Sequence, residues 1–203
     1  MLKNIFFILL LFSFSSIFSQ RDSIFSQRDQ NNTWKFKLGV NFVQDLQDKT
    51  PFSGFSQFET TAFNGLPLFI SVEKRINNIV GIDLSASFNR WESGKGIIAG
   101  TTVTENVSYN SVDASLNIYL NKIFSFSSDI DWLDVYAKGG FGYFDMPESA
   151  ISLSFGAGFS IWFSDKIGLD LGVIGKRGNI VRLSPGLEEI GHIQHYAGLV
   201  MRF

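Results

Sequence analysis

The stretch Tyr196-Ala-Gly-Leu-Val-Met-Arg-Phe203 decides the fold that this sequence predicts. Counting back from its last residue by twos gives one apolar face, made of Phe203, Met201, Leu199 and Ala197. The residues between them form a mixed face, made of Arg202, Val200, Gly198 and Tyr196. A period of two is typical of a β-strand whose faces lie in different environments. We therefore predict a C-terminal strand with one apolar face and one mixed face.

The same strand has the spacing of a barrel assembly signal. An aromatic residue, a glycine, an apolar residue and a final aromatic residue stand at Tyr196, Gly198, Met201 and Phe203. This spacing resembles the terminal strand that the barrel assembly machinery of the bacterial outer membrane recognises. An ordinary edge strand would show the same alternation. We predict that these four residues form the assembly signal and that the assembly machinery is a partner.

Seven upstream segments repeat the two-residue alternation. The expected strands are residues 33–43, 65–76, 79–91, 107–120, 133–144, 151–163 and 167–176, followed by 191–203. Strands of about 10 residues cross a bilayer when tilted, whereas strands of soluble sandwiches are usually about half as long. A soluble lipocalin-type barrel is the main competitor, but the polar faces are rich in Ser and Gly, which fits a crowded lumen better than a solvated surface. We predict an all-β, eight-stranded antiparallel up-and-down transmembrane β-barrel.

The N-terminus predicts export. Lys3 precedes an apolar run, so residues 1–19 are expected to form a secretory signal peptide. The heptad at residues 16–22 is repeated at residues 23–29 and offers a second cleavage point, as late as residue 26. We expect residues 20–32 to form a flexible leader and residues 33–203 to form the barrel domain.

The composition excludes several classes of site. The 203-residue chain has no cysteine, so it has neither a disulfide framework nor a thiolate metal site. Its net charge of −2 argues against nucleic acid as a partner. We expect no cofactor.

The connections predict the topology. Long loops are expected at residues 44–64, 92–106 and 177–190, with a brief one at 146–149, and we place these four outside the cell and the barrel termini in the periplasm. Residues 121–132 are too many for a tight turn, so either the preceding strand extends or the turn carries a small flap.

Charged residues recur on the mixed faces, which a barrel turns inward. The acids are Glu73, Asp83, Asp113, Asp134 and Asp170, and the bases are Lys35, Lys37, Arg75, Lys138, Lys176 and Arg202. An eight-stranded barrel has room only for its own side chains, and buried charges need partners. We predict a salt-bridge network that plugs the lumen, with a narrow gated conduit as the alternative. Asp113 and Lys138 are the candidate central pair, although another lumen base could pair with Asp113 instead.

Aromatic residues gather near the expected strand ends. A membrane-interface belt accounts for Trp34, Phe42, Phe88, Trp91, Trp132, Tyr143, Phe163 and Phe203. The first long loop holds Phe52, Phe55, Phe58 and Phe63, which either pack across the barrel mouth or contact another outer-membrane protein.

The two histidines invite a metal or catalytic interpretation. His192 and His195 are three residues apart on one expected strand, so they point to opposite faces and cannot easily share a metal. An outer-membrane lipid hydrolase could use His195 with a Ser and an acid, but no Ser lies on that strand. We predict neither a catalytic nor a metal site.

Three segments carry a family resemblance. Residues 32–41 (NTWKFKLGVN), 164–171 (SDKIGLDL) and 192–198 (HIQHYAG) resemble the first barrel strand, the sixth turn and the last strand of OmpA-type outer-membrane proteins of the Bacteroidetes. The resemblance covers about residues 32–203 and implies an eight-stranded barrel in the outer membrane. The peptidoglycan-binding domain of full OmpA would follow Phe203, and we expect this chain to lack it.

These features predict a small outer-membrane barrel with a structural or interaction role, in contact with outer-membrane lipid. Its extracellular loops are candidate contacts for other outer-membrane proteins. Two alternatives stay open: a lipid-modifying or proteolytic outer-membrane enzyme, and a subunit of a secretion or motility assembly.

Overall fold

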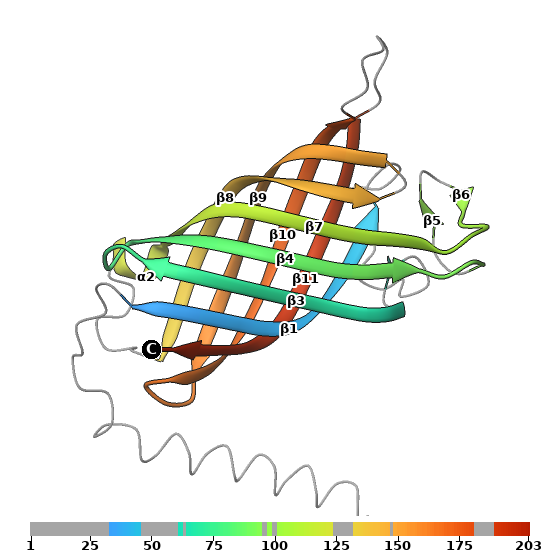
Figure 1. The fold of residues 1–203 in the computed structure, drawn as a ribbon. Coiled ribbons are helices and arrows are strands. Elements are labelled where there is room, and N and C mark those ends of the chain that lie inside the picture. The colour runs from blue at the N-terminus through green and yellow to red at the C-terminus, as the bar shows by residue number, and fades with distance from the viewer. Residues whose placement is uncertain are drawn as a thin grey trace, which may run out of the picture.

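Eight long strands close into a barrel. The computed structural model describes residues 33–45, 61–62, 64–94, 97–98, 101–123, 132–146, 148–180 and 189–203. The strands are β1 (Trp34–Asp45), β3 (Asn64–Arg75), β4 (Val80–Trp91), β7 (Val107–Tyr119), β8 (Leu133–Met146), β9 (Glu148–Trp162), β10 (Ile167–Ile180) and β11 (Glu189–Arg202). Each pairs antiparallel with its neighbour in the sequence order, and β11 pairs with β1 (Figure 1). The predicted eight-stranded up-and-down barrel is confirmed.

The two ends of the barrel differ. At the terminal end, the backbone of Trp34 exchanges two hydrogen bonds of 3.0 Å with that of Phe203, and the short helix α2 (Leu120–Ile123) lies nearby (Figure 1). The opposite, loop end carries the hairpin of β5 (Ile97–Ile98) and β6 (Thr101–Thr102), together with β2 (Thr61–Ala62), which pairs with β1.

Several connections differ from those expected. The 146–149 loop is shorter, because Met146 of β8 already pairs with Glu148 of β9. The pairing of β10 with β11 continues as far as Asn179 opposite Glu189, so the 177–190 loop is shorter than expected. After β7 the chain turns into α2 at Leu120, so the strand does not extend into residues 121–132. The signal peptide, the leader and the four loop phenylalanines lie outside the described residues.

The apolar faces point outward. Leu84 and Phe155 are 58% and 70% exposed, whereas inward neighbours such as Asp83 and Ser154 are buried. In a water-soluble protein the apolar side chains would be buried and the polar ones exposed. The reverse arrangement seen here is typical of a membrane barrel, whose outer face contacts lipid and whose inner face is polar. In the described part of the chain, no helix has both the length and the apolar character needed to cross a membrane.

The aromatic belt is partly as expected. Trp34, Phe88, Tyr143, Phe163 and Phe203 are exposed on the outer surface. Trp91 is fully buried in the barrel, so its assignment to the belt is wrong. Its position, two residues after the inward Asn89, would have placed it in the lumen because alternate strand residues share a face.

One irregularity interrupts the wall between β3 and β4. Their register shifts between Asn64 and Leu68, and the extra segment contains Pro67, which has no backbone N–H to donate. The inward side chain of Asn41 donates to the carbonyls of Leu68 at 2.7 Å and Phe88 at 3.1 Å. Asn89 donates to the Asn41 side-chain oxygen at 2.9 Å. These amides supply hydrogen bonds beside the shift.

Candidate functional site: the barrel lumen

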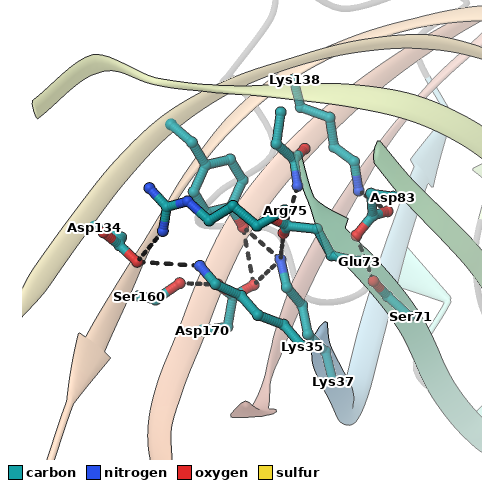
Figure 2. A network of polar contacts seen from close by, with 12 residues as sticks. Lys35, Lys37, Ser71, Glu73, Arg75, Asp83, Asp134, Lys138, Ser160 and Asp170 are labelled. Carbon is teal, nitrogen blue, oxygen red and sulfur yellow. Dashed lines mark hydrogen bonds and ion pairs between the residues drawn. The ribbon is translucent and has the colours of Figure 1, made fainter. Parts of the chain in front are cut away.

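A charged cluster crosses the lumen near its terminal end. One oxygen of Asp134 lies 3.1 Å from the Lys35 ammonium and 3.4 Å from the guanidinium groups of Arg75 and Arg202, and Trp162 donates to it at 3.1 Å. We call these five residues the floor. β8 is the fourth strand from β1 in both directions around the ring, so the Lys35–Asp134 pair spans the barrel. Figure 2 shows Lys35 and Arg75 pointing toward Asp134.

Aromatic rings support the cations of the floor. The Arg75 guanidinium lies 3.6 Å from the centre of the Tyr119 ring, and that of Arg202 lies 3.9 Å from the Trp162 ring. The Lys35 ammonium also donates to the Tyr119 hydroxyl at 2.8 Å. Three cations facing one carboxylate need such further contacts, because the carboxylate alone cannot compensate all of them.

Further along the lumen, a second group of pairs is centred on Lys37. Its ammonium lies 3.2 Å from Asp170 and 3.7 Å from Glu73. Asp170 also accepts hydrogen bonds from Ser160 at 2.5 Å and Tyr136 at 2.9 Å (Figure 2). Glu73 accepts from Asn117 at 2.8 Å and from the Tyr119 hydroxyl. These groups join β1 and β3 to β7, β8, β9 and β10.

The expected pairing of Asp113 with Lys138 is wrong. Asp113 lies 2.6 Å from Lys176, and Lys138 lies 2.7 Å from Asp83, which also accepts from Ser71 at 2.5 Å. The register explains the difference, because Asp113 stands opposite Gly142, four residues along β8 from Lys138. Asp113 therefore pairs with another of the predicted lumen bases, and each of the eleven predicted lumen charges takes part in an ion pair.

The loop end of the lumen is closed differently. A buried apolar cluster, which we call the cap, consists of Val43, Trp91, Val103, Tyr109, Phe144, Met146 and Ala150. Val103 belongs to the segment between β6 and β7, and the backbone of Gly94 donates to its carbonyl at 2.8 Å. The cap thus combines residues of β1, β4, β7, β8 and β9 with one from a loop.

His192 lies directly beneath this cluster. Its Nε2 is 2.8 Å from the Tyr109 hydroxyl, which also accepts from Lys176 at 3.1 Å, and its ring meets that of Phe144 edge-on at 4.6 Å. β7 is the fourth strand from β11 in both directions, so this contact also spans the barrel. His195 is half-buried on the opposite face, as expected. Among the described residues, no group of His, Cys, Asp or Glu could hold a metal ion.

The role of Tyr109 in the lumen was not predicted from the sequence. It faces the lumen in the same alternation as Asp113, four residues later on β7. That alternation was a usable signal, but the sequence alone does not reveal that its hydroxyl meets Lys176 and His192 from β10 and β11.

The residues proposed as an assembly signal occupy both faces of β11. The Tyr196 ring stacks on Phe69 at 4.5 Å, and its hydroxyl lies 2.8 Å from that of Tyr136. A Cβ on Gly198 would lie 2.6 Å from the carbonyl oxygen of Leu38, so glycine allows β11 and β1 to approach closely here. Met201 and Phe203 are exposed outward. Tyr196 and Gly198 therefore have packing roles of their own.

Comparison with known families identifies the barrel. Residues 7–174 match the family model described as the outer membrane protein beta-barrel domain. This chain belongs to that family. Membership in this family places the protein in the cell outer membrane. No curated protein matches it.

Three solved structures illustrate the fold. Ail, the attachment invasion locus protein of Yersinia pestis, is 15% identical with a TM-score of 0.53, covering 86% of this chain and all of Ail. OprG of Pseudomonas aeruginosa is 11% identical with a TM-score of 0.54, covering 85% and 96%. Outer Membrane Protein W of E. coli is 13% identical with a TM-score of 0.52, covering 85% and 98%. At these identities the likeness concerns the fold alone.

Proposed function

We propose that this protein is a small outer-membrane barrel with a plugged lumen and a structural or interaction role. The observation that carries the proposal is that lumen side chains from opposite strands touch. Lys35 meets Asp134 at one level and Tyr109 meets His192 at another, each pair joining strands four places apart on the ring. A lumen crossed at two levels by buried, mutually bonded side chains leaves little room for an aqueous path.

The buried charges support a plug rather than a selectivity filter. A conducting lumen would keep its charges hydrated, whereas Lys35, Asp134, Lys176 and Asp113 are each at most 3% exposed and paired with one another within 3.1 Å. Such pairs persist only where their partners are fixed, because an orphaned buried charge is costly. The plugged lumen leaves the extracellular loops and the lipid-facing surface to carry the function.

The remaining parts of the proposal follow from the sequence. We assign the chain to the OmpA-type barrels of the Bacteroidetes, with a cleaved signal peptide, periplasmic termini and loops that face the exterior. Its partners would be outer-membrane lipid, the assembly machinery and other outer-membrane proteins.

Ion conductance tests the plug. The purified barrel should show no steady conductance in planar lipid bilayers in 1 M KCl at moderate voltage. Brief, rare conductance events would agree with a plug whose side chains move apart transiently. A stable ohmic step in most insertions would contradict the proposal and favour the gated-conduit alternative.

Two matched phenylalanines test the assembly signal. Phe203 and Phe155 are 71% and 70% exposed on the lipid face, so truncating either removes a similar contact. Phe203→Ala should lower the folded fraction in cells, read as heat-modifiable gel migration, whereas Phe155→Ala should not. Both variants should refold equally well in detergent. Equal behaviour of the two variants in cells would reject the assembly signal.

A further inference from the structure

His192 joins the cap to β11 from inside the lumen. It is one of two histidines in the chain, and its side chain is completely buried. Its ring meets the rings of Tyr109 and Phe144 edge-on, with centroids 5.1 and 4.6 Å apart. Both partners belong to the cap. A single imidazole on β11 therefore contacts cap residues of β7 and β8.

The hydrogen bonds around Tyr109 determine where His192 carries its proton. An ammonium group only donates, so the Tyr109 oxygen accepts from Lys176 at 3.1 Å. Its single hydroxyl proton then has two acceptors, His192 Nε2 at 2.8 Å and Gln194 Oε1 at 3.4 Å. The shorter contact assigns this proton to Nε2. His192 is thus an acceptor at Nε2, which requires a neutral ring with its own proton on Nδ1.

A lysine stands beside this ring. Lys176 is the register partner of His192 on β10, and its charge is paired with Asp113 at 2.6 Å. From β7 and β8 the ring faces the two uncharged cap rings described above. On β1 its register partner is Asp45, the last residue of that strand. A proton on the ring would place a second positive charge beside an ammonium group whose carboxylate is already engaged.

Such a proton would also reverse the bond to the cap. Nε2 would become a donor, so the Tyr109 oxygen would accept from two cations and its hydroxyl would have to turn toward Gln194. Nδ1 has no hydrogen-bond partner among the described residues, so nothing described there would share the added charge. A buried charge without partners is costly. Separation of the ring from the cap, which admits water, relieves that cost.

We propose that His192 is an acid-sensitive latch at the loop end of the plug. The neutral ring holds β11 to the cap, and a proton on the ring releases the cap. The charged groups of the floor are a carboxylate, an ammonium and two guanidinium groups, which ordinarily keep their charges between about pH 5.5 and 7.5. Acid therefore loosens one end of the lumen and leaves the other closed. This inference rests on the plugged lumen proposed above and adds a condition under which one end of it opens.

The pH dependence of unfolding tests the latch. A histidine in an unfolded chain has a pKa of about 6.5, so a folded barrel that keeps His192 neutral loses stability in acid, because the unfolded chain binds more protons. Lowering the pH from about 7.5 to about 5.5 should raise the unfolding equilibrium constant in urea by about tenfold through this residue. His192→Gln should lose that dependence, whatever its stability at neutral pH. His195→Gln, the matched control on the opposite face of β11, should keep most of it.

Two results of this experiment would overturn the proposal. One is an equal pH dependence of the wild-type barrel and His192→Gln. The other is a barrel that acid stabilises through His192. That result would mean that a carboxylate pairs with the charged ring, and Asp45→Asn, at the register partner on β1, should then abolish the stabilisation.

The position of the ring proton can be measured directly. Because the chain has two histidines, nitrogen NMR spectra of the histidine-labelled barrel contain two imidazole groups, and His195→Gln leaves that of His192 alone. At neutral pH its proton should lie on Nδ1. A proton on Nε2 would contradict the assigned hydrogen bond and remove the basis of the latch.

Amide hydrogen exchange separates release of the cap from failure of the plug. In lipid nanodiscs, acid should lower the protection of the Tyr109 and Phe144 amides severalfold relative to those of Asp134 and Trp162 in the floor. In His192→Gln this ratio should be the same at both pH values. A ratio that acid leaves unchanged in the wild-type barrel rejects the latch alone, whereas steady conductance at neutral pH rejects the plug on which it rests.

Discussion

The floor and the cap close the same lumen with opposite chemistry. In the floor, Asp134 lies within 3.4 Å of three cations from β1, β3 and β11. In the cap, Trp91, Phe144 and Met146 pack with few polar contacts, and the Tyr109 hydroxyl is the main polar link to the lumen below. Removing one partner of a charged closure leaves the other charges uncompensated, whereas truncating a side chain of an apolar closure removes its contacts and leaves a cavity. We therefore expect the two ends to respond differently to small changes.

The largest effect should come from neutralising the floor. Asp134→Asn removes the carboxylate that pairs with the buried Lys35 and Arg75 and with the partly buried Arg202, and breaking a buried ion pair costs roughly 3–5 kcal/mol. The free energy of unfolding, measured in urea with the barrel in detergent, should fall by about that amount. Glu105→Gln, in the exposed segment between β6 and β7, is the control and should change it little. A small loss at Asp134 would mean that water, not the carboxylate, compensates the floor.

The polar link of the cap should give a smaller effect. Tyr109→Phe keeps the ring within the cap but removes the hydroxyl that meets Lys176 and His192. Leaving those groups unsatisfied should cost about 1–3 kcal/mol in the same urea assay. His192→Gln should also lower the free energy of unfolding, because it alters the contact with the Tyr109 hydroxyl. His195→Gln, on the opposite face of β11, leaves that contact in place and is the control. A loss as large as that of Asp134→Asn would remove the distinction between the two ends.

Ionic strength should have the smallest effect. Lys35, Asp134, Lys176 and Asp113 are nearly inaccessible to solvent, and buried pairs are screened far less than exposed ones. Raising NaCl from about 0.1 M to 1 M, where the Debye length falls from ~10 Å to ~3 Å, should leave the unfolding midpoint of the wild-type barrel nearly unchanged. A marked loss of stability in salt would indicate a hydrated lumen throughout.

How far the sequence predicts the structure depends on the level of detail. The alternation of apolar and polar residues predicted the eight strands, and it correctly predicted that Asp113, Lys138 and Lys176 face the lumen. This alternation could not predict which charges pair across the lumen. The period of a strand gives the face on which a residue lies, but not its position along the barrel axis relative to residues of non-adjacent strands. Lys138 and Asp113 lie on adjacent strands, yet each reaches past its neighbour, to β4 and β10 respectively.

The cap shows a second limit. Trp91 and Tyr109 follow the inward alternation of β4 and β7, so their direction was predictable. The contribution of Val103 was not, because it comes from a turn segment outside the strand periodicity. Local patterns thus predict the walls of this barrel, while the contents of its lumen depend on how eight strands are staggered.

A double-mutant cycle on Asp113 and Lys176 tests most directly the central claim that paired side chains cross the lumen. These residues lie on β7 and β10, which are not neighbours, and their charged atoms are 2.6 Å apart. Asp113→Ala and Lys176→Ala should each destabilise the barrel, and the double variant should lose less than their sum, with a coupling of about 0.5–3 kcal/mol. The parallel cycle of Asp113 with Lys138 should give a smaller coupling. Additive losses for Asp113 and Lys176 would contradict a lumen closed by such pairs.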